Sequence, residues 1–253
     1  MLRKLAPLLL VGVAVIVGIF GYMAMRTPAA PSGQLQAVPL QIQNGAASAP
    51  AAATAPQVAG VAVTSATDPA SSSATNLTLF QIQPGQSKAT FTLTELLNGS
   101  PNTVVGTTDQ VAGQLAFDPT APITAQVGTI TVDARGLTTD DRQRNRMIQN
   151  VILSTGQFEY VTFQPTSVSG LPPSGTPGQS YNAEIAGQLT IRDVTKPVTF
   201  TATVTPASTT QLSGSAKTLI NRSDWNLQIP SIPFVASVSD QVQLQLDFVA
   251  TAA

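Results

Sequence analysis

Four arginines form the densest cluster of charge in the sequence, because Arg135, Arg142, Arg144 and Arg146 lie within twelve residues. Guanidinium groups bind phosphate or pyrophosphate through paired hydrogen bonds, so one interpretation is a site for an anionic headgroup. The other is salt bridging to the neighbouring aspartates on a solvated helix. Both interpretations stay open, and the candidate headgroup ligands are Arg142, Arg144, Arg146 and Arg222.

The composition excludes several other kinds of chemistry. The 253 residues contain neither His nor Cys, which rules out disulfides, Ser-His or Cys-His catalytic pairs, and zinc sites built on these residues. A net charge of −1 argues against nucleic acid as a partner. No phosphate-binding glycine loop or serine-nucleophile motif is present, so we expect no enzymatic activity and no cofactor. We assign no metal ligands, although calcium or magnesium bound by carboxylates alone stays open. A hydrolase with two carboxyl groups about 5–10 Å apart in a cleft remains a rival hypothesis.

The elements that must position these residues have the pattern of β-strands. Apolar side chains alternate with mostly polar ones, chiefly Thr and Gln, in residues 91–94, 185–191, 198–204 and 242–248. A period of two predicts antiparallel strands with one buried face. Turn sequences such as Asn98-Gly99 fall between the runs. The sequence therefore predicts an all-β domain.

Residues 140–156 depart from this period. Two aspartates begin the segment, and Met147, Ile148, Val151 and Ile152 then form one apolar helical face. About eight strands with one short helix exclude an alternating βα fold, and either a sandwich or a barrel would bury the apolar faces. Residues 103–118 are long for one strand of a sandwich, and glycines at 106 and 113 suit the coiling of a barrel. We favour an antiparallel barrel.

The inward faces of such a barrel carry mostly Val, Leu, Ile, Ala and Gly. They either fill the core or surround a cavity for a long aliphatic ligand, which would gain about 0.8 kcal/mol for each buried CH2. Trp225, the single tryptophan, plugs one end or stacks on a ligand. The predicted apolar lining consists of Phe91, Leu93, Val111, Leu115, Phe117, Ile130, Val132, Phe158, Phe163, Leu189, Phe200, Trp225, Leu244, Leu246 and Phe248.

Several segments resemble the YceI-like, polyisoprenoid-binding family. The clearest is Ala186-Gly-Gln-Leu-Thr-Ile-Arg-Asp-Val-Thr-Lys-Pro-Val198, which is similar to that family's G-x-L-T-I-x-G-V-T-K-P-V. Tyr160-Val-Thr-Phe163 and Asn221-Arg-Ser-Asp-Trp225 also fit. The resemblance covers essentially all of residues 77–250. It implies a lipocalin-like antiparallel barrel outside the cytoplasm with an apolar cavity for an isoprenoid, and it carries no enzymatic activity.

The sequence also departs from the family pattern. The usual Gly before Val-Thr-Lys-Pro-Val is Asp193, and the frequent Arg-Asp of the helix is Arg144-Asn145. Asn226 follows Trp225 where Gly is common. The helix and the loop after Trp225 are expected near the mouth of the barrel, so the departures affect the headgroup that is bound more than the fold.

The chain is expected to have three parts. Residues 1–26 contain an uncharged run at 5–25, whose length of roughly 30 Å suits a transmembrane helix that is retained as an anchor, although a cleaved signal peptide is an alternative. Residues 27–76, rich in Ala, Pro, Ser and Thr, form a disordered linker. Residues 77–253 form the barrel.

We expect a single-pass protein of the cell membrane with the barrel outside, which binds an isoprenoid or similar lipid to carry, store or sense it. A solid β module used for adhesion is the alternative, and a homodimer is left open.

Overall fold

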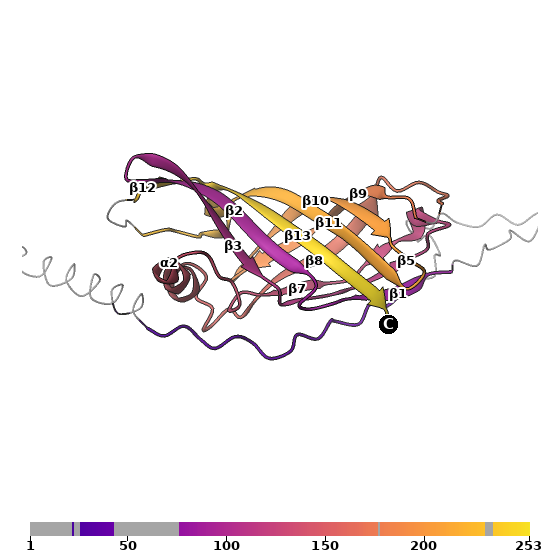
Figure 1. The fold of residues 1–253 in the computed structure, drawn as a ribbon, viewed down its shortest axis with the longest axis horizontal. Helices are drawn as coiled ribbons and strands as arrows, with labels where there is room; N and C mark the ends of the chain where they lie inside the picture. The colour runs from indigo at the N-terminus through magenta and orange to yellow at the C-terminus, as the bar shows by residue number, and fades with distance from the viewer. Residues whose placement is uncertain (1–21, 23–25, 43–75, 177, 231–234) are drawn as a thin grey trace, which may run out of the picture.

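In the residues that the structure describes, the folded part of the chain is one curled antiparallel sheet with a single short α-helix (Figure 1). This computed structural model describes residues 22, 26–42, 76–176, 178–230 and 235–253. Its sheet has thirteen strand segments, which confirms the all-β class and the antiparallel pairing. The strands are β1 Thr78–Ile82, β2 Lys88–Leu97, β3 Ser100–Thr108, β4 Val111–Ala112, β5 Gln114–Phe117, β6 Gln126–Val127, β7 Ile130–Asp133, β8 Tyr160–Ser169, β9 Tyr181–Ile191, β10 Val194–Pro206, β11 Gln211–Asn221, β12 Val235–Val238 and β13 Gln241–Ala252.

The sheet curls because residues 100–117 are hydrogen-bonded along both edges. On one edge β3 pairs with β2 and β5 pairs with β1. On the other edge β4 pairs with β7, β5 pairs with β6, and Thr107 forms a bridge with Thr138. From β7 the pairing continues through β8, β9, β10, β11 and β13 to β1 and β2. The single strand expected over residues 103–118 is thus three segments, since the chain changes partners along its length.

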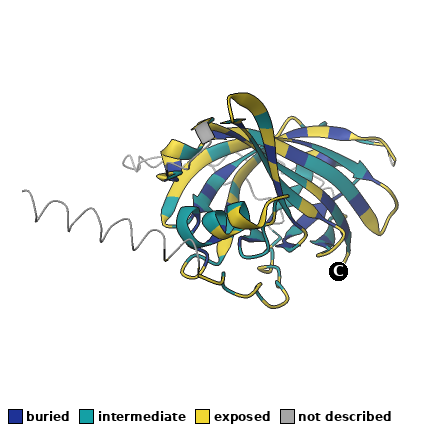
Figure 2. Cartoon of the chain, turned by 60° about the vertical axis from the view of Figure 1, so that its left-hand side comes forward, coloured by how far each residue is buried: buried dark blue, intermediate teal, exposed yellow. Residues whose placement is uncertain are grey.

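Period-two alternation places the two faces of each strand as predicted. Figure 2 shows positions of different burial alternating along several strands, and on β9 buried positions recur at every second residue over much of the strand. The predicted turn at Asn98-Gly99 joins β2 to β3, where Leu97 pairs with Ser100. Both turn residues have positive φ, 52° and 79°, the conformation that a two-residue hairpin requires and that Asn and Gly adopt most readily.

The predicted helix is shorter than residues 140–156. Helix α2 spans Arg142–Met147 and continues as a π-helical turn, η3, over Ile148–Ile152. Asp141 caps α2, because its carboxylate accepts a hydrogen bond of 2.7 Å from the backbone N–H of Arg144. The helix lies at the same end of the sheet as the β2–β3 hairpin and β12 (Figure 1).

The opposite end of the sheet is filled by side chains. It holds the 3-10 turn η2, Pro122–Thr124, and the loop between β8 and β9. The rings of Phe117 and Tyr181 lie 6.0 Å apart there, both almost fully buried. The Tyr181 hydroxyl donates to the carbonyl of Thr176 and accepts from its N–H, each at 2.8 Å. A buried tyrosine hydroxyl needs such partners, and these fasten the loop over this end.

The first part of the predicted linker lies against the sheet (Figure 1). Residues 26–42 have no regular secondary structure, yet they are hydrogen-bonded to the folded part. Ser32 donates from its N–H and its hydroxyl to the buried carboxylate of Asp133, at 3.1 and 3.0 Å. The N–H of Leu40 donates to Gln114 at 2.7 Å. The remainder of the predicted linker, residues 43–75, lies outside the described residues.

The predicted location as a single-pass membrane protein is corrected. Among the residues that the structure describes, no helix has the length and apolar character needed to cross a bilayer. Apart from Tyr22, the run at 5–25 that was expected to form the anchor lies outside the described residues. The assignment to the membrane is therefore not retained.

Candidate functional site

The curled sheet surrounds a cavity of about 670 Å³. Its lining is apolar apart from eight side chains, Thr90, Glu95, Asn98, Asp141, Gln143, Arg144, Arg222 and Gln245. The exposed members of the lining are Asn98, Asp141 and Gln143, all at the α2 end of the sheet. The cavity therefore meets solvent at that end, while Phe117 and Tyr181 fill the other.

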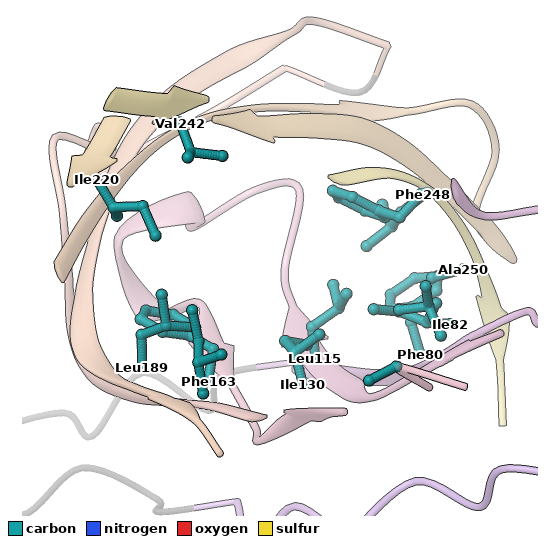
Figure 3. Close-up of a cluster of buried hydrophobic side chains, with 14 of the residues drawn as sticks. Phe80, Ile82, Leu115, Ile130, Phe163, Leu189, Ile220, Val242, Phe248 and Ala250 are labelled. Carbon is teal, nitrogen blue, oxygen red and sulfur yellow. The ribbon is translucent and has the colours of Figure 1, made fainter. Parts of the chain in front are cut away.

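Most of the predicted lining residues meet in this cavity, since they occupy inward positions of different strands. Figure 3 shows apolar side chains from several strands directed toward the interior, among them Phe163, Leu189, Ile220 and Phe248. Phe163 and Phe200, on β8 and β10, touch edge to face with ring centroids 4.8 Å apart. The predicted residues that line the cavity are Phe91, Leu93, Leu115, Ile130, Val132, Phe163, Leu189, Phe200, Leu244, Leu246 and Phe248.

Four predicted lining residues lie elsewhere. Val111 and Phe117 are buried in the packed core outside the cavity. Trp225 is also buried, and its indole N–H donates to the carbonyl of Leu189 at 3.2 Å, so it acts as a plug beside the wall. Phe158 is half-buried on the outside of the lining, with the Arg192 guanidinium 5.6 Å from its ring centroid. The period of two identified the inward-facing residues, but it does not reveal how far along the curled sheet, relative to the cavity, a side chain lies.

Glycines in the wall decide where two of the large rings lie. The ring of Phe91 covers Gly106, its register partner on β3, so closely that a Cβ at 106 would collide with it. A Cβ at Gly187 would come within 2.7 Å of the Phe163 ring. Each ring occupies the space that a side chain on the neighbouring strand would otherwise take. Consequently the rings lie along the wall, and this leaves volume in the centre.

The mouth of the cavity holds a buried ion pair. The Glu95 carboxylate accepts from Arg144 Nη2 at 3.0 Å and from Asn102 Nδ2 at 2.9 Å. Arg144 also pairs through Nη1 with Asp140, four residues earlier. The Glu95 side chain is only 7% exposed and that of Arg144 is 22% exposed. The pair joins helix α2 to strand β2 across the entrance.

The arginine cluster that was considered as a headgroup clamp does not assemble at the cavity. Arg142 and Arg146 are exposed and do not line it. Arg135 pairs with Glu159 at 3.0 Å, away from the lining. Arg222 does line the cavity, but its guanidinium donates to the carbonyls of Leu227 and Ser239 at 2.8 and 3.2 Å. Of the predicted headgroup ligands, the structure thus brings only Arg144 and Arg222 to the cavity, each already hydrogen-bonded.

Sequence reasoning missed Glu95 as a site residue, although a signal was present. Phe91 and Leu93 were predicted to face inward, and the same alternation gives Glu95 an inward position. A charged residue at an inward position is unusual and must find a partner. That partner, Arg144, is 49 positions away in the sequence, so pairing could not be deduced from local pattern.

Among the carboxylates outside the mouth, Asp118 and Asp240 have a lowered pKa. Burial raises the pKa of Asp118 at the filled end, but hydrogen bonds from the hydroxyl and N–H of Thr120 and the N–H of Asn76 outweigh it and lower the pKa. A hydrogen bond from the Ser223 hydroxyl, with Arg222 nearby, lowers the pKa of Asp240.

Among the described residues no three potential metal-binding side chains gather in one place.

These features define a class: an all-β protein whose curled sheet surrounds an apolar cavity with a polar, ion-paired mouth. The chain belongs to the YceI-like family, because the model of the YceI-like domain matches residues 80–250. The family resemblance found in the sequence is thereby confirmed.

Relatives of the chain agree with this assignment. A UPF0312 protein of Pseudomonas fluorescens is 28% identical over 151 residues, which cover 57% of this chain and 73% of that protein. BcnA of Burkholderia cenocepacia superposes with a TM-score of 0.53 at 22% identity, over 67% of this chain and 99% of BcnA. A polyisoprenoid-binding domain from Saccharophagus degradans has a TM-score of 0.54 at 14% identity, over 70% of this chain and 100% of that domain. At these identities the two structures show a shared fold.

Proposed function

We propose that this protein is a lipocalin-like barrel of about eight strands that binds an isoprenoid or a similar long apolar lipid without covalent chemistry. The observation that carries the proposal is the 670 Å³ cavity with its apolar lining. A volume of this size is typical of small-molecule sites.

The chemistry of the lining favours a hydrocarbon chain. Each CH2 that leaves water contributes about 0.8 kcal/mol, whereas a polar ligand would lose hydrogen bonds that the wall cannot replace. A related fold in Saccharophagus degradans is described as a polyisoprenoid-binding domain, which supports an isoprenoid as the chain.

The alternative of a solid β module is not favoured, because side chains leave the centre of the sheet open. The carboxylate-based hydrolase is not favoured either. The two acids of the lining are Glu95, which pairs with Arg144, and Asp141, which caps α2. We therefore propose carriage, storage or sensing of the lipid.

Filling the cavity tests the proposal. Ala216 lines the cavity on β11, and its neighbour Lys217 points to the outer face. Ala216→Phe should abolish the uptake of geranylgeraniol, measured by native mass spectrometry and by displacement of a fluorescent apolar dye. Lys217→Phe adds the same ring outside and should bind as the wild type does. Absence of lipid uptake by the folded wild-type protein would refute the function.

A further inference from the structure

Glu95 interrupts an otherwise apolar row in the wall of the cavity. On β2 the lining residues Phe91, Leu93 and Leu97 share its inward position, and its side chain is only 7% exposed. Removing a carboxylate from water is unfavourable, and pairing it with an arginine often only offsets that cost. An apolar residue would pack at this position without the penalty. The acid at this position therefore calls for an explanation beyond folding.

The hydrogen bonds of Glu95 leave one of its oxygens available. Asn102 and Arg144 both donate to Oε1. No residue within the described ranges donates to Oε2, although a carboxylate oxygen accepts up to two hydrogen bonds. Because Glu95 lines the cavity, a ligand headgroup that carries a hydrogen-bond donor can donate to Oε2.

The arginines of the lining are, in contrast, occupied. The two ends of the Arg144 guanidinium pair with Asp140 and Glu95, and Arg222 is held by two backbone carbonyls. The lining thus has two acids, Glu95 and Asp141, and two arginines that are already bonded. A phosphate or diphosphate entering the cavity would approach the buried Glu95 carboxylate, which repels it at short range and low dielectric, while both guanidinium groups of the lining are already paired with acids or carbonyls.

We propose that Glu95 is a specificity-determining residue: it accepts a hydrogen bond from an uncharged, hydroxyl-bearing lipid head and discriminates against phosphorylated heads. The inference rests on the proposed lipid-binding function and adds the headgroup class to it. The Arg144–Glu95 pair keeps Arg144 from recruiting an anion, and Asn102 holds the carboxylate in register with β3.

The experiment compares two ligands that share one chain. Dissociation constants of geranylgeraniol and geranylgeranyl diphosphate are measured for the full chain by displacement of the same apolar dye. The wild type should bind the alcohol at least about tenfold more tightly than the diphosphate, as expected when one ligand gains a charge-assisted hydrogen bond and the other meets repulsion.

Variants identify the residue responsible. Glu95→Gln keeps the shape, removes the charge and frees Arg144, so the diphosphate should bind about tenfold more tightly and the preference should disappear. Glu184→Gln, at an exposed position on β9, is the matched control and should retain the wild-type preference. Circular dichroism establishes that the variants are folded.

The outcomes separate the two proposals. Equal or tighter binding of the diphosphate by the wild type overturns the headgroup inference and leaves lipid binding intact, and it does so even if Glu95→Gln does not fold. An unchanged preference in a folded Glu95→Gln protein also overturns it. Failure of both ligands to bind to the wild type refutes the lipid-binding function itself.

Discussion

The ring of Phe248 on β13 lies against Gly214, its register partner on β11. A Cβ at position 214 would approach Cζ of that ring to 2.7 Å and would also collide with the backbone carbonyl of Thr203. Gly106 has a similar relation to Phe91, but there the three nearest atoms all belong to the flexible phenylalanine ring. A side chain added at Gly106 therefore requires only a movement of the Phe91 ring, whereas one added at Gly214 also requires a movement of the backbone. This difference can be tested.

Gly106→Ala should lower lipid affinity more than it lowers stability. The added methyl group displaces the Phe91 ring toward the cavity and reduces its volume, while the backbone stays in place. Gly214→Ala should instead destabilise the fold by about 1–3 kcal/mol, because the carbonyl of Thr203 cannot move without disturbing the β10–β11 ladder. Urea unfolding and dye displacement measure the two effects. Equal loss of stability in both variants would contradict this explanation.

Arg144→Ala should destabilise the protein by about 1–3 kcal/mol, since it leaves the Glu95 carboxylate buried with Asn102 as its remaining partner. Arg146→Ala, an exposed position on the same helix, is the control and should change stability by less than about 0.5 kcal/mol. If the pair is responsible, Glu95→Ala combined with Arg144→Ala should be less destabilising than the sum of the single variants. Additive effects would show that the pair has no coupling energy.

Asp118 should make stability depend on pH in the acid range. Its pKa is lowered in the folded state, so its hydrogen bonds stabilise the fold above the ordinary carboxyl value of 3.8 and are lost as the pH falls through the lower folded value. Asp118→Asn should be less stable at neutral pH and should lose less stability between neutral pH and about pH 3. Urea unfolding at a series of pH values measures this difference. Parallel pH profiles for the two proteins would contradict the assigned role.

Gly99→Ala should lower the free energy of unfolding by about 1 kcal/mol through backbone strain alone. The residue has φ of 79° in the β2–β3 turn, and no atom lies close enough for a Cβ to collide. Gly156→Ala is the control, because that position has the same free space and lacks a positive φ, so its stability should be unchanged or slightly higher. Similar costs at both positions would show that the turn conformation is not the cause.

Local pattern was sufficient for much of this structure. Alternation over residues 242–248 and 198–204 predicted antiparallel strands and their inward faces, and Asn98-Gly99 predicted its hairpin. The apolar face of residues 147–152 predicted the helix that borders the cavity. These features follow from interactions between residues close in sequence, for which period and turn chemistry are direct signals. The same alternation, continued from Phe91 and Leu93, also predicts an inward position for Glu95.

Whether the interior is open or filled was decided only by the tertiary structure. It depends on rings such as Phe91 and Phe163 lying over glycines of neighbouring strands, and on Phe117 and Tyr181 filling one end. The hydrogen-bond partners of the arginines could not be predicted from the sequence either. Arg144 pairs with Glu95, 49 positions away, and Arg222 donates to backbone carbonyls. Cavity volume and charge pairing arise from contacts between distant segments, and a one-dimensional pattern does not encode how closely those segments approach.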